Sequence, residues 1–101
     1  MASTNEYLSF VLEQLSGLET VTARPMMGEY ILYFHGKVIG GVYDNRLLLK
    51  PSRSAMNLMC EAGLDAPMER PYDGAKEMLL ADMDRRELLC RLVQAIADDL
   101  S

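Results

Sequence analysis

The sequence predicts an α+β fold, a two-layer sandwich in which helices cover one face of an antiparallel sheet. Between residues 20 and 50, short apolar segments alternate with tight two-residue turns, which is typical of antiparallel strands. The flanking segments carry apolar residues three and four apart, which indicates amphipathic helices. Strands and helices segregated in this way favour the α+β class. The expected order is helix, four strands, helix, strand, helix, in a single domain spanning residues 1–101.

Composition and charge restrict the kind of protein. Half of the 101 residues are hydrophobic and a quarter are charged, which excludes a disordered chain, and the formal net charge is −5. No apolar run approaches the length of a membrane span, and the start lacks the basic and apolar regions of a signal peptide. Two cysteines without a secretory signal indicate free thiols in a reducing compartment. We therefore expect a soluble, cytoplasmic, acidic domain.

The first helix is expected to begin at Ser3, because Ser3 and Glu6 have the spacing of a capping box. Gly17 is the expected stop, since glycine adopts the left-handed conformation without strain. The apolar stripe of this helix is Tyr7, Leu8, Val11, Leu12 and Leu15.

Four strands are expected at residues 20–24, 29–34, 37–43 and 46–50. Pro25 is expected to end the first strand or to sit at an edge or bulge, because proline cannot donate a ladder hydrogen bond. His35-Gly36 and Asp44-Asn45 are the expected two-residue turns between the later strands.

Those two turns predict a register, with Leu32 opposite Ile39 and Gly40 opposite Leu49. One sheet face, uncharged and expected to carry the helices, then comprises Ile31, Tyr33, Val38, Gly40, Val42, Leu47 and Leu49. The other face comprises Tyr30, Leu32, Phe34, Lys37, Ile39, Gly41, Tyr43, Arg46, Leu48 and Lys50.

The rest of the chain predicts two helices and a strand. A helix begins at Pro51-Ser52 and stops at Gly63, with Ala55, Met56, Met59 and Cys60 inward. After a loop over residues 63–74, residues 76–81 read as the fifth strand. The last helix is expected to begin at Asp82 or Asp84, and its stripe is Leu88, Leu89, Leu92, Val93, Ile96 and Leu100.

The segment from Arg24 to Lys50 resembles the N-terminal domain of the TfoX/Sxy competence-regulator family. The matching residues are the runs 24–33 (RPMMGEYILY), 36–38 (GKV) and 44–50 (DNRLLLK), with Met27 where the family usually has Phe. The matched motif positions are Arg24, Met27, Gly28, Tyr33, Gly36 and Asp44. The resemblance implies a small α+β domain that takes part in transcriptional or competence regulation. In competence regulators this domain precedes a C-terminal helical domain, which we expect this short form to lack.

The residues indicate no catalytic or metal site, and we expect no cofactor. His35 lies in a turn without a neighbouring nucleophile or orienting carboxylate. Cys60 and Cys90 lie on helical apolar faces or their margins, and the sequence has no CxxC motif or histidine cluster. The acidic pair Asp98-Asp99 is expected to be a solvated tail.

The second sheet face is the predicted partner-binding surface, with Tyr30, Leu32, Phe34, Lys37, Ile39, Tyr43, Arg46, Leu48 and Lys50 as its residues. Three cations could set specificity at its rim. Either the last helix wraps over this face, or another protein or a second copy covers it. The net charge of −5 opposes direct nucleic-acid binding.

The preferred hypothesis is therefore a non-enzymatic protein-interaction module. One alternative is a small-molecule-binding or enzymatic domain with a pocket near Arg24, Tyr33 and Tyr72. Another is a chaperone-like structural homodimer.

Overall fold

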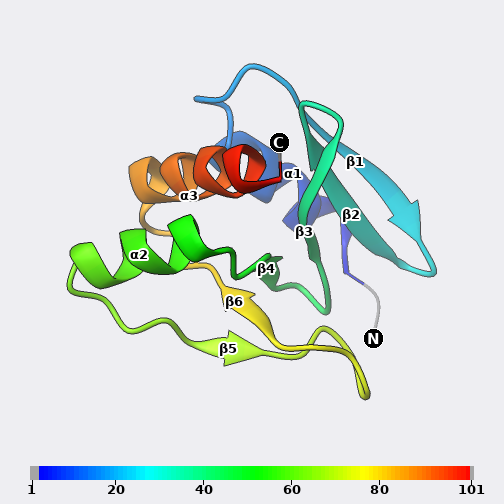
Figure 1. Cartoon of the computed structure of the whole chain (residues 1–101). Helices are drawn as coiled ribbons and strands as arrows, with labels where there is room; N and C mark the ends of the chain where they lie inside the picture. Colours follow the sequence, from blue (N-terminus) through cyan, green and yellow to red (C-terminus); the bar gives the residue numbers. More distant parts are fainter. Residues whose placement is uncertain (1–2, 101) are drawn as a thin grey trace.

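The computed structural model describes residues 3–100 and confirms the α+β fold, with helices packed on one face of an open antiparallel sheet (Figure 1). The elements are α1 (Asn5–Gln14), β1 (Val21–Met26), β2 (Glu29–Phe34), β3 (Lys37–Val42), β4 (Leu47–Leu49), α2 (Arg53–Glu61), β5 (Met68–Glu69), β6 (Met78–Leu80) and α3 (Arg86–Asp99). The strand order across the sheet is β1-β2-β3-β4-β6-β5. The expected element order is confirmed, with the two-residue strand β5 added inside the predicted loop.

Three two-residue turns connect β1 to β4, and all their central residues have positive φ. The turns at His35-Gly36 and Asp44-Asn45 are confirmed. A third turn, at Met27-Gly28, has φ values of 51° and 85° and joins β1 to β2. The expected end of the first strand at residue 24 is wrong, because β1 continues through Pro25 to Met26, but the alternative that Pro25 lies at a sheet edge is confirmed. Proline is tolerated there since β1 is an edge strand.

A β-bulge overturns the predicted register between β2 and β3. Tyr33 pairs with Val38, but Leu32 pairs with Gly40 rather than with Ile39. Ile39 is therefore an extra residue in β3. Counting outward from the turn missed it, because an inserted residue shifts the alternation of side chains on one strand only. The pairing of Gly40 with Leu49 is as predicted.

The bulge redistributes the side chains between the two faces of the sheet. We call the face that packs on the helices the inner face and the opposite one the outer face. Leu32, Phe34 and Ile39, which were assigned to the outer face, are buried in the core. Conversely, Ile31 pairs with Gly41 and faces outward. The predicted sheet faces are thus wrong for β2 and the start of β3. They are right for the inner-face residues Gly40, Val42, Leu47 and Leu49.

All three helices contribute to one core against the inner face. α1 supplies Val11, its C-cap supplies Leu15, and α2 supplies Ala55 and Met59, all of them buried. α2 and α3 lie side by side over the sheet (Figure 1). α3 contributes Leu89, Leu92, Val93, Ile96 and Ala97. The longest described helix, α3, has 14 residues, and none of the described helices is long and apolar enough to cross a membrane.

Helix α2 ends as expected, whereas α1 and α3 begin later than predicted. Ser52 caps α2, and Gly63, with φ 70°, ends it through a hydrogen bond from its N–H to the Cys60 carbonyl. The Cys60 side chain itself is exposed rather than inward. Thr4, not Ser3, caps α1.

Two other predictions about helix ends are wrong. α1 ends at Gln14 with Leu15 as its C-cap, before Gly17. α3 begins at Arg86, because the Asp82 carboxylate accepts a hydrogen bond from the Asp84 N–H in a turn that precedes the helix.

Replacing Gly40 with alanine should lower the free energy of unfolding by about 2–3 kcal/mol, as overpacking of a tight site does. A Cβ at this position would lie 2.2 Å from the Leu48 carbonyl oxygen and 2.9 Å from the Leu49 Cα, which are backbone atoms that cannot rotate away. Urea unfolding measures the change. Gly17→Ala is the matched control, since its Cβ would sit 3.4 Å from the Cys90 Sγ. Equal midpoints for the two variants would contradict this account of the bulge.

Candidate functional site

The predicted partner-binding residues do not form one surface. Leu32, Phe34 and Ile39 are at most 2% exposed and belong to the core. Substituting Ile39 with a charged residue would therefore disrupt the fold itself. This part of the predicted surface is wrong, and the bulge in β3 is the reason.

The remaining residues of that set are divided between different surroundings. Tyr30 packs against the core and donates its hydroxyl to Asn5 Oδ1 at 2.6 Å. Lys37 donates from Nζ to the Ala97 carbonyl at 3.3 Å, near the C-terminus of α3. Lys50 is half-buried at the end of β4. Tyr43, Arg46 and Leu48 remain on the outer face, but Leu48 is completely buried.

The outer face carries an apolar concavity of about 520 Å³, between the tip of the β1–β2 hairpin and the loop that joins β5 to β6. We call it the hairpin groove. It is lined by Met26, Met27, Glu29, Tyr43, Pro71 and Tyr72. Elements far apart in the sequence therefore build one site, which the sequence analysis did not predict as a whole.

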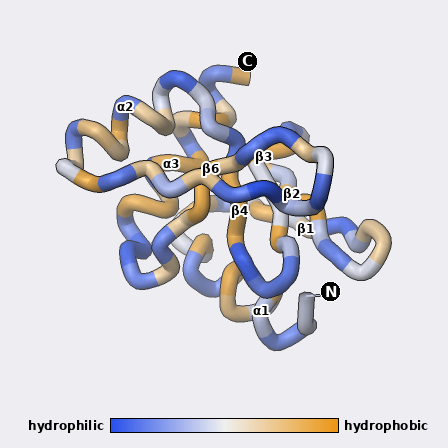
Figure 2. Tube along the Cα trace, turned by 90° about the horizontal axis from the view of Figure 1, so that it is seen from below, coloured by the Kyte–Doolittle hydropathy of each residue, from blue (hydrophilic) through white to orange (hydrophobic). Residues whose placement is uncertain are grey.

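The rim of the hairpin groove exposes large apolar side chains. Met27 is 98% exposed, Tyr72 is 61% exposed and Met26 is 40% exposed. Figure 2 shows the projecting tip of the β1–β2 hairpin, at the right of the view, coloured toward the hydrophobic end of the scale. Clustered exposed apolar side chains are the informative exception on a protein surface and mark interaction sites.

Tyr43 forms the floor of the groove. Its side chain is 7% exposed, and its ring centroid lies 6.4 Å from that of Tyr72. The ring occupies space that Gly41 leaves free, because a Cβ at Gly41 would come within 2.6 Å of Tyr43 Cε2. Burial, and then the neighbouring phenol of Tyr72 and carboxylate of Glu29, raise the pKa of Tyr43 above its ordinary value.

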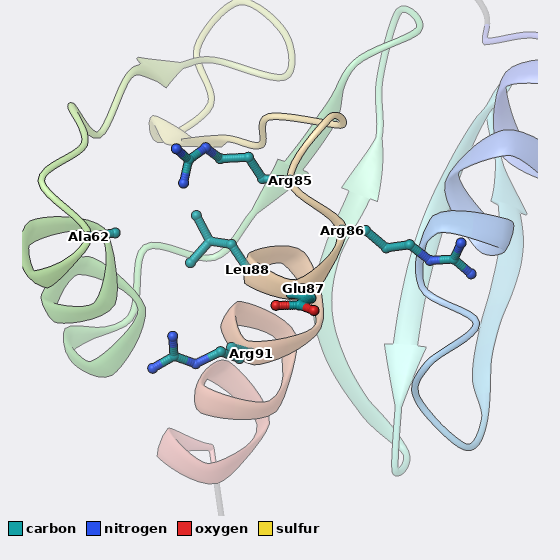
Figure 3. Close-up of a pocket in the computed structure, with 6 residues that line it drawn as sticks. All are labelled: Ala62, Arg85, Arg86, Glu87, Leu88 and Arg91. Carbon is teal, nitrogen blue, oxygen red and sulfur yellow. The ribbon is translucent and has the colours of Figure 1, made fainter.

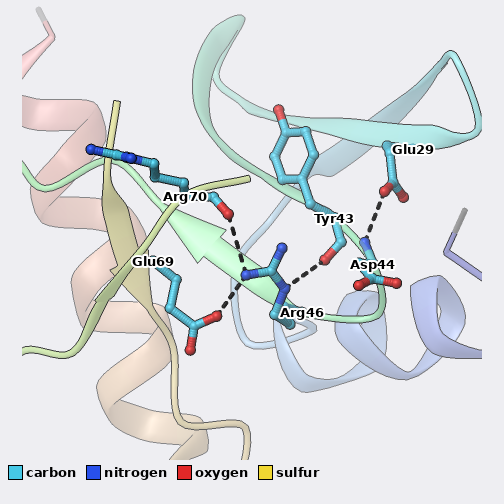
Figure 4. A network of polar contacts seen from close by, with 6 residues as sticks. All are labelled: Glu29, Tyr43, Asp44, Arg46, Glu69 and Arg70. Atoms are coloured by element: carbon cyan, nitrogen blue, oxygen red, sulfur yellow. Dashed lines mark hydrogen bonds and ion pairs between the residues drawn. The ribbon is translucent and has the colours of Figure 1, made fainter. Parts of the chain in front are cut away.

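Glu29 fixes the hairpin wall of the groove to the rest of the molecule. Its carboxylate accepts hydrogen bonds from the Ser3 N–H at 2.9 Å and the Ser3 hydroxyl at 2.6 Å. It also accepts from the Asp44 N–H at 2.9 Å (Figure 4). Asn45 Oδ1 in turn accepts from the Thr4 N–H at 3.0 Å. This polar network joins the start of α1 to two of the hairpin turns.

Arg46 fixes the opposite wall. Its guanidinium pairs with the Glu69 carboxylate at 2.6 Å and donates to the carbonyls of Arg70 and Tyr43 (Figure 4). The ion pair is partly exposed, so its net contribution to stability is about 0–1 kcal/mol. Its main effect is geometric, because it holds the segment that carries Pro71 and Tyr72 against β4.

A second concavity, of about 430 Å³, lies at the start of α3 and is bordered by three arginines. Arg86 points toward α1 (Figure 3), where it bonds the Glu13 carbonyl and the Ser16 hydroxyl. Arg85 and Arg91 extend on the other side of α3, toward Ala62. All three arginines are exposed, so this charged surface is solvated and has the character of an ordinary helix end.

The other candidates from the sequence occupy structural positions. His35 lies in its turn, with its ring edge-on to Phe34 at 4.1 Å between centroids. Arg24 stacks over the Tyr33 ring at 5.4 Å, but Tyr72 lies beside Tyr43 instead of joining them. Asp99, expected in a solvated tail, accepts from the Ser54 N–H at 2.9 Å at the start of α2, and this bond lowers its pKa.

The model of the TfoX N-terminal domain matches residues 13–97. The chain belongs to the TfoX N-terminal domain family. It is also 37% identical over 82 residues to an uncharacterized 12.7 kDa protein in the trpE 5′ region of Spirochaeta aurantia, covering 81% of this chain and 68% of the relative. The family resemblance expected from residues 24–50 is thus confirmed. In this TfoX N-terminal domain, the motif positions Met27, Gly28, Gly36 and Asp44 are the turns of the hairpins.

A local signal for the groove was present in part. Met26-Met27-Gly28 separates two strand-like segments, and the glycine could have marked a turn that exposes a methionine. Tyr72 had no such signal, because its approach to Tyr43 depends on a pairing between Arg46 and Glu69 that spans 23 residues.

Substituting Tyr72 with phenylalanine should lower the pKa of Tyr43 toward its ordinary value, because one raising influence is removed. In the native domain the raised pKa means that this tyrosine stabilises the fold below about pH 10 and loses that contribution as pH rises through its folded pKa. NMR titration of the tyrosine ring carbons measures both values. An unchanged Tyr43 pKa in the variant would show that the Tyr72 hydroxyl does not contribute to the raised value.

Proposed function

We propose that this TfoX N-terminal domain is a non-catalytic interaction module that acts in transcriptional or competence regulation by docking a partner protein in the hairpin groove. The family membership supports a regulatory type of domain. The observation that carries the proposal is the conformation and exposure of Met27.

Met27 has two features that disfavour it at its position. Its φ of 51° is a left-handed conformation, which costs a residue with a Cβ about 1–2 kcal/mol. Asparagine, aspartate and glycine adopt this conformation more readily and are common in such turns. Met27 is also 98% exposed, so it gains nothing from burial within the chain. Nothing within the described molecule compensates for placing this large apolar side chain at the hairpin tip.

Burial of Met27 against a partner protein would offset the conformational cost of its positive φ. Transferring a large apolar side chain from water into an interface contributes about 1.5–3 kcal/mol. Methionine adapts its shape to differing surfaces, and tyrosines such as Tyr72 are enriched among the residues that dominate binding energy. The Glu29 and Arg46 networks hold the backbone of both walls, so little ordering is required on binding.

Replacing Met27 with asparagine should weaken partner binding while stabilising the fold. The resulting Asn-Gly turn suits two positive φ values, so the free energy of unfolding should rise by about 1 kcal/mol in urea unfolding. Recovery of partner proteins from the native cells, quantified by affinity purification and mass spectrometry, should fall for Met27→Asn and for Tyr72→Ala.

Phe10→Ala is the matched control, because Phe10 is an exposed apolar residue of α1 that does not line the groove. Its partner recovery should equal that of the native chain. Undiminished recovery with Met27→Asn would contradict the proposed docking site.

A further inference from the structure

We infer that the occupant of the hairpin groove is a basic amphipathic segment of another protein, which inserts apolar side chains between Met27 and Tyr72 and places lysine or arginine at the rim. This inference rests on the proposed function and specifies the chemistry of the partner.

The charge around the groove is negative. Of the residues that line it, Glu29 alone is charged. Its hydrogen-bond donors are neutral N–H and O–H groups, so its charge is retained rather than neutralised. Asp44 lies in the turn that Glu29 binds, and Asp73 follows Tyr72 in the loop. Both aspartates are exposed. Glu29 in the lining, and Asp44 and Asp73 directly after the lining residues Tyr43 and Tyr72, therefore favour a positively charged partner.

Three arginines lie near the groove, but none of them lines it. Arg46 is paired with Glu69 at 2.6 Å, so that pair is neutral overall. Arg24 lies over the Tyr33 ring and does not line the groove. The Arg70 side chain extends away from Tyr43 (Figure 4). The whole chain also carries a net charge of −5, which attracts basic partners over a longer range.

The dimensions of the groove favour a short segment. Six residues line it, whereas each side of a standard protein–protein interface uses about 20–30. A volume of about 520 Å³ lies within the range of sites that enclose a compact apolar group. One face of an amphipathic helix, or a few residues of an extended segment, presents side chains of this size.

A second copy of the chain fits the site less well. A two-fold contact brings the same surface of each copy together, so the acidic residues of both copies would lie in one interface. Like charges brought together in this way oppose association. A positively charged partner can bury Met27 and Tyr72 without this repulsion.

The test uses three short synthetic peptides: an amphipathic helix of leucine and lysine, its leucine–glutamate counterpart, and a scrambled leucine–lysine peptide without an apolar stripe. Isothermal titration calorimetry with the full chain should show binding of the first. Binding of the other two should be about tenfold weaker or more, because one lacks charge complementarity and the other lacks an apolar face.

Variants assign the binding to the groove. Met27→Asn should weaken binding of the amphipathic basic peptide, and Asp44→Asn combined with Asp73→Asn should weaken it about three- to tenfold and reduce its salt dependence. The matched control is Glu61→Gln with Asp65→Asn, which removes the same charge from exposed positions at the last residue of α2 and in the loop after it. The control should bind like the native chain.

Each contrary result has a distinct meaning. Equal binding of the glutamate peptide, or no effect of the Asp44 and Asp73 changes, would overturn the basic partner while leaving apolar docking intact if Met27→Asn still weakens binding. Peptide binding that is insensitive to Met27→Asn would place the peptide outside the hairpin groove and overturn the basic partner, whereas partner recovery with Met27→Asn tests the proposed function separately. A dimer in sedimentation that Met27→Asn dissociates would identify a second copy as the occupant and overturn the basic partner.

Discussion

The extra residue at Ile39 in β3 determines which side chains share the inner face of the sheet. Without it, the alternation of side chains would place Leu32 and Phe34 on the opposite face from Val42, Leu47 and Leu49. With it, apolar residues from β2, β3 and β4 share the inner face and bury against the three helices. Gly40 makes this possible, because the Leu48 carbonyl approaches too closely for any Cβ.

The same bulge also shapes the outer face. It pairs Leu32 with Gly40, and beside this pair Ile31 faces Gly41. The space over Gly41 then accepts the ring of Tyr43, which becomes the floor of the hairpin groove. The two adjacent glycines therefore act on opposite faces of the sheet. Gly40 permits the close approach of β3 and β4 over the core, and Gly41 leaves space for the Tyr43 ring beneath the hairpin groove.

Sequence reasoning predicted the features that depend on local chemistry. Residue types that favour turns and helix caps were found in those roles. They are the turns His35-Gly36 and Asp44-Asn45, the N-cap Ser52 and the helix stop Gly63. Sequence reasoning failed where a residue acts against its local preference. Met27 gives no signal for positive φ, and Ile39 gives no signal for a bulge. The groove required both, together with the pairing of Arg46 with a glutamate 23 residues away, so the candidate site was largely unpredictable.

The hairpin groove combines a backbone held by hydrogen bonds with flexible apolar side chains, and this combination suits a binding site. Glu29 ties the hairpin to the start of α1 and to the Asp44 turn, so the tip is held by tertiary hydrogen bonds and not by the turn alone. A tip held this way tolerates an unfavourable residue at its apex. Methionine contributes flexible apolar contact area there, while the backbone is already ordered, so binding does not have to order it. The hydrogen bonds of Glu29 thus hold the hairpin whose turn keeps Met27 in its left-handed conformation.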